Sequence, residues 1–115
     1  GNDVLNGGLG NDKLYGGAPG GAGASGDDTF TFDDDPTGAA IDTVMDFGNS
    51  AGDNDTIDLS YVVTNVNGNN FAQWKTDNVE QDGANTVIHF GDDQAVLLNV
   101  TASTLNFDDF LFSDV

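Results

Sequence analysis

The stretch Gly7-Gly8-Leu9-Gly10-Asn11-Asp12-Lys13-Leu14-Tyr15 is the part of the sequence that decides the fold. It matches the pattern G-G-x-G-x-D-x-U-x, in which U is a large apolar residue. The first six positions predict a turn, because glycine adopts positive φ angles and leaves backbone carbonyls free to point inward. The last three positions predict a short strand whose apolar residue, Leu14, enters the core. Each such unit turns the chain through half a circuit, so units two apart are expected to stack.

The same pattern continues on both sides of this stretch. Gly1–Asn6 carries the last six positions of a preceding unit. A third unit begins at Gly16 and resumes at Gly26–Thr31 if Pro19–Ser25 is an insertion. The insertion contains only Pro, Gly, Ala and Ser, which predicts a flexible bulge. Because the chain opens inside a unit, we expect it to be a piece of a longer protein. The three units are expected to place one apolar residue each in the core: Leu5, Leu14 and Phe30.

The charge of the chain restricts its partners. Among 115 residues, 20 are acidic and 2 are basic, which gives a net charge of −18. Repulsion at this density opposes compaction unless cations are recruited. A nucleic-acid partner is excluded, because binding phosphates needs a basic surface. We expect no direct membrane insertion, because no apolar run approaches the ~20 residues of a span. The absence of cysteine rules out disulfides, thiol catalysis and Cys-based zinc sites.

The sixth position of each unit is occupied by an aspartate. One aspartate beside glycine is an ordinary turn residue. The fixed spacing of these aspartates instead indicates that stacked turns bracket a hard cation held entirely by oxygen, and we expect this cation to be Ca²⁺. The carboxylate ligands predicted by the pattern are Asp3, Asp12 and Asp28. The predicted carbonyl ligands belong to the turn glycines Gly1, Gly8, Gly10, Gly17 and Gly26.

These units resemble the calcium-binding repeats of the RTX, or haemolysin-type, family. Further along, Gly26–Phe32, Asp42–Phe47 and Asp55–Ser60 are similar to segments that close the roll in serralysin-type metalloproteases. Alginate epimerase R-modules and other type I-secreted proteins carry similar segments. The resemblance implies that a downstream aspartate completes the site of Asp12, and the three candidates are Asp42, Asp46 and Asp55. Surface charge and strand-end capping are the other roles open to them.

The resemblance implies an all-β fold, in which a parallel β-roll of calcium-binding nonapeptide repeats continues into an antiparallel β cap. Residues 1–32 would be the repeats and residues 33–115 the cap, together forming one continuous domain. Within the cap, Phe71–Lys75 alternates weakly, as a strand does. Thr86–Phe90 and Ala95–Val100 are predicted strands, joined by a hairpin turn at Gly91–Gln94. Thr101–Leu105 is predicted to form one helical turn capped by Thr101.

Catalysis is not expected of this chain. No H-E-x-x-H motif occurs, and the sole histidine, His89, lies inside a predicted strand, where a half-buried packing role is expected. An EF-hand loop starting at Asp33 fails, because its twelfth position is Val44 in place of the required glutamate. Trp74 is expected to pack in the core or at its rim, with carbohydrate stacking as the alternative.

The leading functional hypothesis is a calcium-binding module that drives the calcium-dependent folding and type I secretion of a larger extracellular protein. Asp109–Phe112 and Asp114–Val115 place acidic residues before apolar ones at the end of the chain. The resemblance implies that this end is an uncleaved type I secretion signal, and an ordinary last strand is the alternative. The expected partners are calcium ions and the type I secretion machinery, and the location is the cell surface or the medium. The alternative function is polysaccharide or cell-surface binding, for which a glycan or an upstream domain would be the partner.

Overall fold

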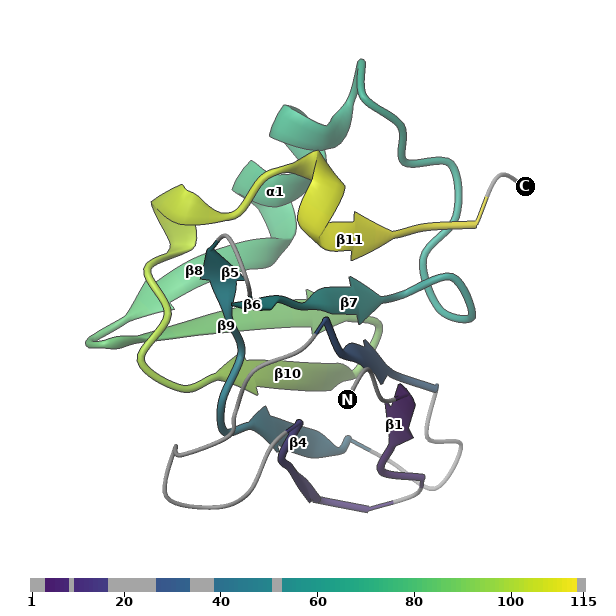
Figure 1. The fold of residues 1–115 in the computed structure, drawn as a ribbon. Helices are drawn as coiled ribbons and strands as arrows, with labels where there is room; N and C mark the ends of the chain where they lie inside the picture. Colours follow the sequence, from purple (N-terminus) through teal and green to yellow (C-terminus); the bar gives the residue numbers. More distant parts are fainter. Residues whose placement is uncertain (1–3, 9, 17–26, 34–38, 51–52, 114–115) are drawn as a thin grey trace.

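The computed structural model describes residues 4–8, 10–16, 27–33, 39–50 and 53–113, which form two main sheets and a short hairpin (Figure 1). Sheet A is parallel throughout and has the order β1 (Val4–Asn6), β3 (Thr29–Thr31), β7 (Thr56–Asp58), β11 (Phe110–Leu111). Sheet B has the order β2 (Lys13–Leu14), β4 (Ile41–Val44), β10 (Asp93–Leu97), β9 (Asn85–Phe90), β8 (Val79–Asp82). The short antiparallel hairpin consists of β5 (Asn49–Ser50) and β6 (Asp53–Asn54).

The repeat strands alternate between the two sheets. β1 and β3 lie in sheet A, whereas β2 lies in sheet B together with β4, the first strand after the repeats. Val4 pairs with Thr29 in the first sheet, and Lys13 pairs with Thr43 in the second. This alternation confirms that each unit turns the chain through half a circuit. The predicted insertion, Pro19–Ser25, lies outside the described residues.

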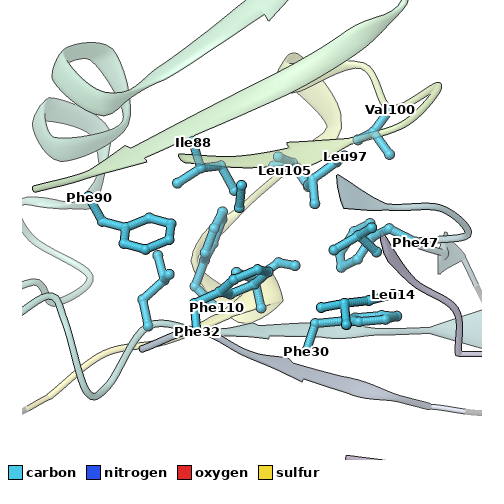
Figure 2. Close-up of a cluster of buried hydrophobic side chains, with 14 of the residues drawn as sticks. Leu14, Phe30, Phe32, Phe47, Ile88, Phe90, Leu97, Val100, Leu105 and Phe110 are labelled. Carbon is cyan, nitrogen blue, oxygen red and sulfur yellow. The ribbon is translucent and has the colours of Figure 1, made fainter. Parts of the chain in front are cut away.

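The core is formed between the two sheets by apolar residues in register. In sheet A, Leu5, Phe30, Ile57 and Phe110 occupy one row across the four strands. In sheet B, the corresponding row contains Leu14, Val44 and Leu97. Figure 2 shows Leu14, Phe30, Phe110 and Leu97 pointing into a common interior. Leu14 and Phe30 are buried and Leu5 packs against them half-buried, as the repeat pattern predicted.

The expected all-β fold, a parallel roll followed by an antiparallel cap, is wrong. Sheet B is mixed, because β10 pairs parallel with β4 on one side and antiparallel with β9 on the other. A helix, α1 (Phe71–Asn78), precedes the antiparallel strands. In Figure 1, α1 and β11 lie at one end of the molecule, and β1 and β4 lie at the other. The C-terminal half therefore extends both sheets and does not form a separate antiparallel layer.

The helix replaces the strand expected at Phe71–Lys75, and aromatic packing explains the difference. Phe71 and Trp74 are three residues apart, which places them on one helical face, whereas a strand would place them on opposite faces. Both rings contact Phe110, with centroid distances of 5.5 Å in each case. Trp74 also contacts Phe112, at 4.9 Å. This tertiary packing outweighs a weak local preference for strand.

The hairpin predicted near Gly91 is present. β9 and β10 pair antiparallel around the turn Gly91–Asp92, and Gly91 has a φ of 65°. β10 ends at Leu97, earlier than predicted, because Asn99 adopts a left-handed φ of 58°. Asn99 is held there by a hydrogen bond of 2.9 Å from its backbone N–H to Oδ1 of Asn85.

Two 3₁₀ turns, Ala102–Thr104 and Phe107–Asp109, lead to the last strand. The first is the helical turn predicted at Thr101–Leu105, but the side chain of Thr101 does not cap it. In the second, Asn106 and Asp109 cap each other's backbone N–H groups reciprocally. Among the described residues, no helix has both the length and the apolar character needed to cross a membrane.

Candidate metal centre

The turn of the central repeat has the backbone that its glycines predicted. Gly8 and Gly10 adopt φ angles of 78° and 90°, in the left-handed region that side chains with a Cβ rarely occupy. The backbone N–H of Gly8 donates a hydrogen bond of 2.8 Å to Oδ1 of Asn6 at the end of β1. Asn6 also donates from Nδ2 to Oδ2 of Asp33, at 2.7 Å. The turn is thus anchored to the strand before it and to the chain segment after β3.

The carboxylate of Asp12 folds back over this turn. A Cβ atom added at Gly7 would lie 2.7 Å from Oδ2 of Asp12, so only glycine leaves room for the carboxylate. This oxygen is fully buried, and no described residue donates a hydrogen bond to it. A buried carboxylate oxygen without a partner is costly, and its presence in a folded chain needs a physical explanation. A bound cation supplies one.

The donor atoms available at the turn around Asp12 are oxygens, which Ca²⁺ accepts as ligands. Calcium takes six to eight oxygen ligands in irregular geometry and accepts backbone carbonyls. The carbonyls of Gly8 and Gly10 belong to the same turn as the Asp12 carboxylate. The described residues contain no cluster of three or more His, Cys, Asp or Glu side chains that could hold a metal ion. A cation at this turn would therefore be held mainly by backbone oxygen.

The three downstream aspartates lie beside three different residues of the repeats. Oδ1 of Asp42 accepts a hydrogen bond of 2.9 Å from the backbone N–H of Asp12. Oδ1 of Asp46 accepts one of 2.8 Å from the backbone N–H of Gly16. Of these candidates, Asp42 is thus the one whose carboxylate is hydrogen-bonded to Asp12. The hydrogen bonds give both side chains the strand-end capping role that the sequence left open beside metal ligation.

Asp55 belongs to the other stack of turns, next to Asp28. Its Oδ1 accepts a hydrogen bond of 2.9 Å from the backbone N–H of Asp28, and its Oδ2 accepts one of 2.8 Å from Gly48. Both aspartates are almost fully buried. The carboxylate of Asp28 lies against Gly16, where an added Cβ would collide with Oδ2. Asp28 therefore repeats the arrangement of Asp12 and Gly7, with a glycine underneath the carboxylate.

Four of the predicted ligands lie outside the described residues: Gly1, Asp3, Gly17 and Gly26. The strand that follows Asp3 is nevertheless in register with the strand that follows Asp28, since Val4 pairs with Thr29. This register is the stacking that the repeat spacing predicted for the two units.

Sequence reasoning missed two side chains that link the turns. Asp93 is almost fully buried, and its Oδ1 accepts a hydrogen bond of 2.8 Å from the backbone N–H of Ala40. Asn11 accepts one of 2.8 Å from the backbone N–H of Ile41. The available signal was positional, because Asp93 stands directly before an alternating apolar segment. From sequence alone, Asp93 is predicted to belong to the hairpin turn Gly91–Gln94.

His89 and Trp74 have structural partners. Nε2 of His89 lies 2.8 Å from Oε1 of Glu80 on the neighbouring strand, at the exposed side of sheet B. Trp74 packs among Phe71, Phe110 and Phe112, which agrees with the packing role expected for it. Neither side chain lies in the repeat turns.

The fold and its turns define a two-sheet protein with a candidate cation site in its N-terminal repeats. No protein-family model matches the chain, and no curated protein matches it. Among solved structures, the crystal structure of the extracellular lipase LipA from Serratia marcescens is similar, with 25% sequence identity and a TM-score of 0.49. The match covers 97% of this chain and 20% of the lipase chain. This chain therefore spans about a fifth of the length of that lipase.

Proposed function

We propose that this chain is a calcium-binding module that folds when the turn Gly7–Asp12 takes up Ca²⁺. The observation that carries the proposal is the buried Oδ2 of Asp12, which no described residue satisfies. Calcium at this oxygen would replace the missing hydrogen bond with a stronger electrostatic interaction. Asp12 would supply the charged ligand, and Gly8 and Gly10 would supply carbonyl oxygen.

The net charge supports a coupling between calcium binding and folding. With a net charge of −18, the chain is less repelled by itself when it is expanded. Burial of Asp28, of Asp55 and of the Oδ2 atom of Asp12 adds a desolvation cost to folding. A divalent cation reduces both costs in the folded state only, because the turns do not exist in the unfolded chain. Its binding free energy therefore becomes folding free energy.

A secreted protein is the context in which this coupling is useful. In a low-calcium cytosol the chain would stay unfolded and remain fit for export. Outside the cell, calcium would fold it. The repeats and the acidic and apolar C-terminal residues support export through a type I machinery as part of a larger protein. In the structure Phe110 and Leu111 also form β11, so this end would have a role in folding as well.

The alternative of polysaccharide binding has less support from the described residues. Trp74, the natural platform for a sugar ring, has other aromatic rings packed against it. A glycan therefore has no evident aromatic surface at this residue.

The test compares Asp12→Asn with Asp82→Asn, which makes the same charge change at an exposed position on β8. Calcium titration, followed by far-UV circular dichroism and calorimetry, gives the affinity of each variant. We expect Asp12→Asn to weaken calcium binding by at least about tenfold, the loss typical of changes around a metal ligand. Asp82→Asn should match the wild type. Equal affinities for the two variants would remove Asp12 from the site and contradict the proposal.

A further inference from the structure

Three successive residues between the repeats and the C-terminal half are held on both sides. On the repeat side, the backbone N–H of Ile41 donates to Asn11, and Asp42 accepts from the backbone N–H of Asp12. On the other side, the backbone N–H of Ala40 donates to Asp93. The segment Ala40–Asp42 is thus bonded to the candidate calcium turn on one side and, through Asp93 among others, to the hairpin β9–β10 on the other.

The position of Asp93 is set by the C-terminal hairpin. Asp93 follows the turn Gly91–Asp92, and the strand it begins pairs with β4 with Gln94 opposite Ile41. The backbone N–H of Gln94 also donates to the carbonyl of Ala40, at 2.9 Å. Both backbone polar groups of Ala40 are therefore hydrogen-bonded to β10. Its carbonyl accepts from Gln94, and its N–H donates to the side chain of Asp93. Since Asp93 is almost fully buried, water does not readily replace that bond.

We propose that Asp93 is a positioning residue for calcium binding at the turn Gly7–Asp12. The inference rests on the proposed function. Asp93 fixes Ala40, which fixes the neighbouring Ile41 and Asp42, and these in turn hold Asn11 and the backbone of Asp12. The proposed calcium ligand is thus oriented by a residue 53 positions beyond Ala40, outside the repeats. Calcium affinity accordingly depends on the C-terminal hairpin through a hydrogen bond and not through the charge of Asp93.

The experiment uses four variants of the full chain. Asp93→Ala removes the acceptor, and Asp93→Asn keeps an oxygen that accepts from Ala40. Asp92→Ala makes the same charge change at the exposed neighbouring residue, and Ile88→Val loosens the core of β9 without touching Ala40–Asp42. Calcium affinity is measured by calorimetry. Amide hydrogen exchange at saturating calcium compares Asp12 and Ile41 with the amides of β9.

We expect Asp93→Ala to weaken calcium binding by about tenfold, as changes that support a metal ligand do. It should also accelerate exchange at Asp12 and Ile41 more than in β9. Asp93→Asn should restore most of the affinity, and Asp92→Ala should match the wild type. An Asp93→Ala variant that behaves like Ile88→Val, with equal acceleration everywhere, would show a general loss of stability and overturn the inference.

Two further outcomes separate this inference from the proposed function. If Asp12→Asn leaves calcium affinity unchanged, the proposed function fails. In that case selective exchange at Asp12 in Asp93→Ala still shows that Asp93 positions the turn, but for a purpose other than calcium. If Asp93→Ala does not fold, the calcium affinity of Asp93→Asn tests the inference instead. A calcium affinity of Asp93→Asn close to that of the wild type supports positioning by a hydrogen bond. A loss of affinity as large as that of Asp12→Asn would mean that the charge of Asp93 acts on the ion directly, and it would overturn the inference.

Discussion

The backbone N–H of Asp12 donates a hydrogen bond to Oδ1 of Asp42, which lies 30 residues later in the chain and directly before Thr43, the strand partner of Lys13. The same spacing recurs between Gly16 and Asp46. In both pairs an aspartate accepts a hydrogen bond from the backbone of a repeat that precedes it in the chain. These bonds place the carboxylates of Asp42 and Asp46 against the backbone of the preceding repeats in a chain of charge −18.

Calcium removal should unfold the chain. In excess EDTA, far-UV circular dichroism should show a disordered chain, and millimolar calcium should restore β-structure cooperatively, because the ion offsets the buried carboxylates. Magnesium should substitute poorly, since it demands a tight octahedron and keeps its waters. Native-like spectra in both EDTA and calcium would contradict the coupling of folding to calcium.

Gly7→Ala should weaken calcium affinity. A methyl group at this position would lie 2.7 Å from Oδ2 of Asp12 and push the carboxylate out of the turn. Gly68→Ala is the matched control, because an added Cβ there meets no atom within 4 Å. Calorimetric titration should therefore separate the two alanine variants by about tenfold in affinity. If both bind calcium like the wild type, the Asp12 carboxylate is not held against Gly7.

Truncation after Asn99 should abolish folding at any calcium concentration. The change removes Leu105 and Phe110 from the core and uncovers Phe71. Each buried Leu or Phe side chain contributes about 1.5–3 kcal/mol, against a typical domain stability of ~5–15 kcal/mol. A truncated chain that still gains β-structure cooperatively with calcium would show that the repeats fold alone.

A point substitution tests the same region more gently. Phe110→Ala should cost about 3–5 kcal/mol, as deletion of a buried Phe side chain does. Phe107→Ala should cost less, because Phe107 is 37% exposed whereas Phe110 is 4% exposed. Thermal or urea unfolding at saturating calcium measures the difference. Similar losses for the two variants would show that Phe110 is not a central member of this packing.

Asp109→Asn should stabilise the protein at neutral pH. Burial raises the pKa of the Asp109 carboxyl above its ordinary value of 3.8, although a hydrogen bond from the backbone of Asn106 opposes this. The folded state therefore binds a proton more readily than the unfolded state, so ionised Asp109 lowers stability above the raised pKa. The cost is relieved as the pH falls through that pKa and vanishes below 3.8.

The substituted amide keeps the acceptor for Asn106 and removes the charge. The gain in melting temperature should be largest at neutral pH and should shrink toward acid, with Asp92→Asn as the exposed control. A lower melting temperature for Asp109→Asn at neutral pH would mean that the charge of Asp109 favours the folded state.

The repeat half could be predicted from sequence because its signals are local. Glycine spacing indicated the turns, and the burial of Leu14 and Phe30 followed from their place in each unit. The helix could not be predicted because the short stretch Phe71–Lys75 carries only a weak pattern, and the aromatic partner of Phe71 and Trp74, Phe110, lies more than thirty residues away. Asp93 was missed for the same reason. Its role as a hydrogen-bond acceptor depends on the parallel pairing of β10 with β4. A local sequence pattern does not predict a pairing between segments about fifty residues apart.

The last strand of sheet A comes from the end of the described chain, since Phe110 of β11 pairs with Ile57 of β7. In sheet B, β10 reaches back to β4 over a similar length, and Ala40 and Asp93 are 53 residues apart. Parallel pairings between such distant segments are slow to form, because the entropy of loop closure is lost before the stabilising contacts are made. While β10 and β11 are still unavailable for pairing, a strand is therefore missing from each of the two sheets. Folding of either sheet is completed only after these late segments of the chain have joined it.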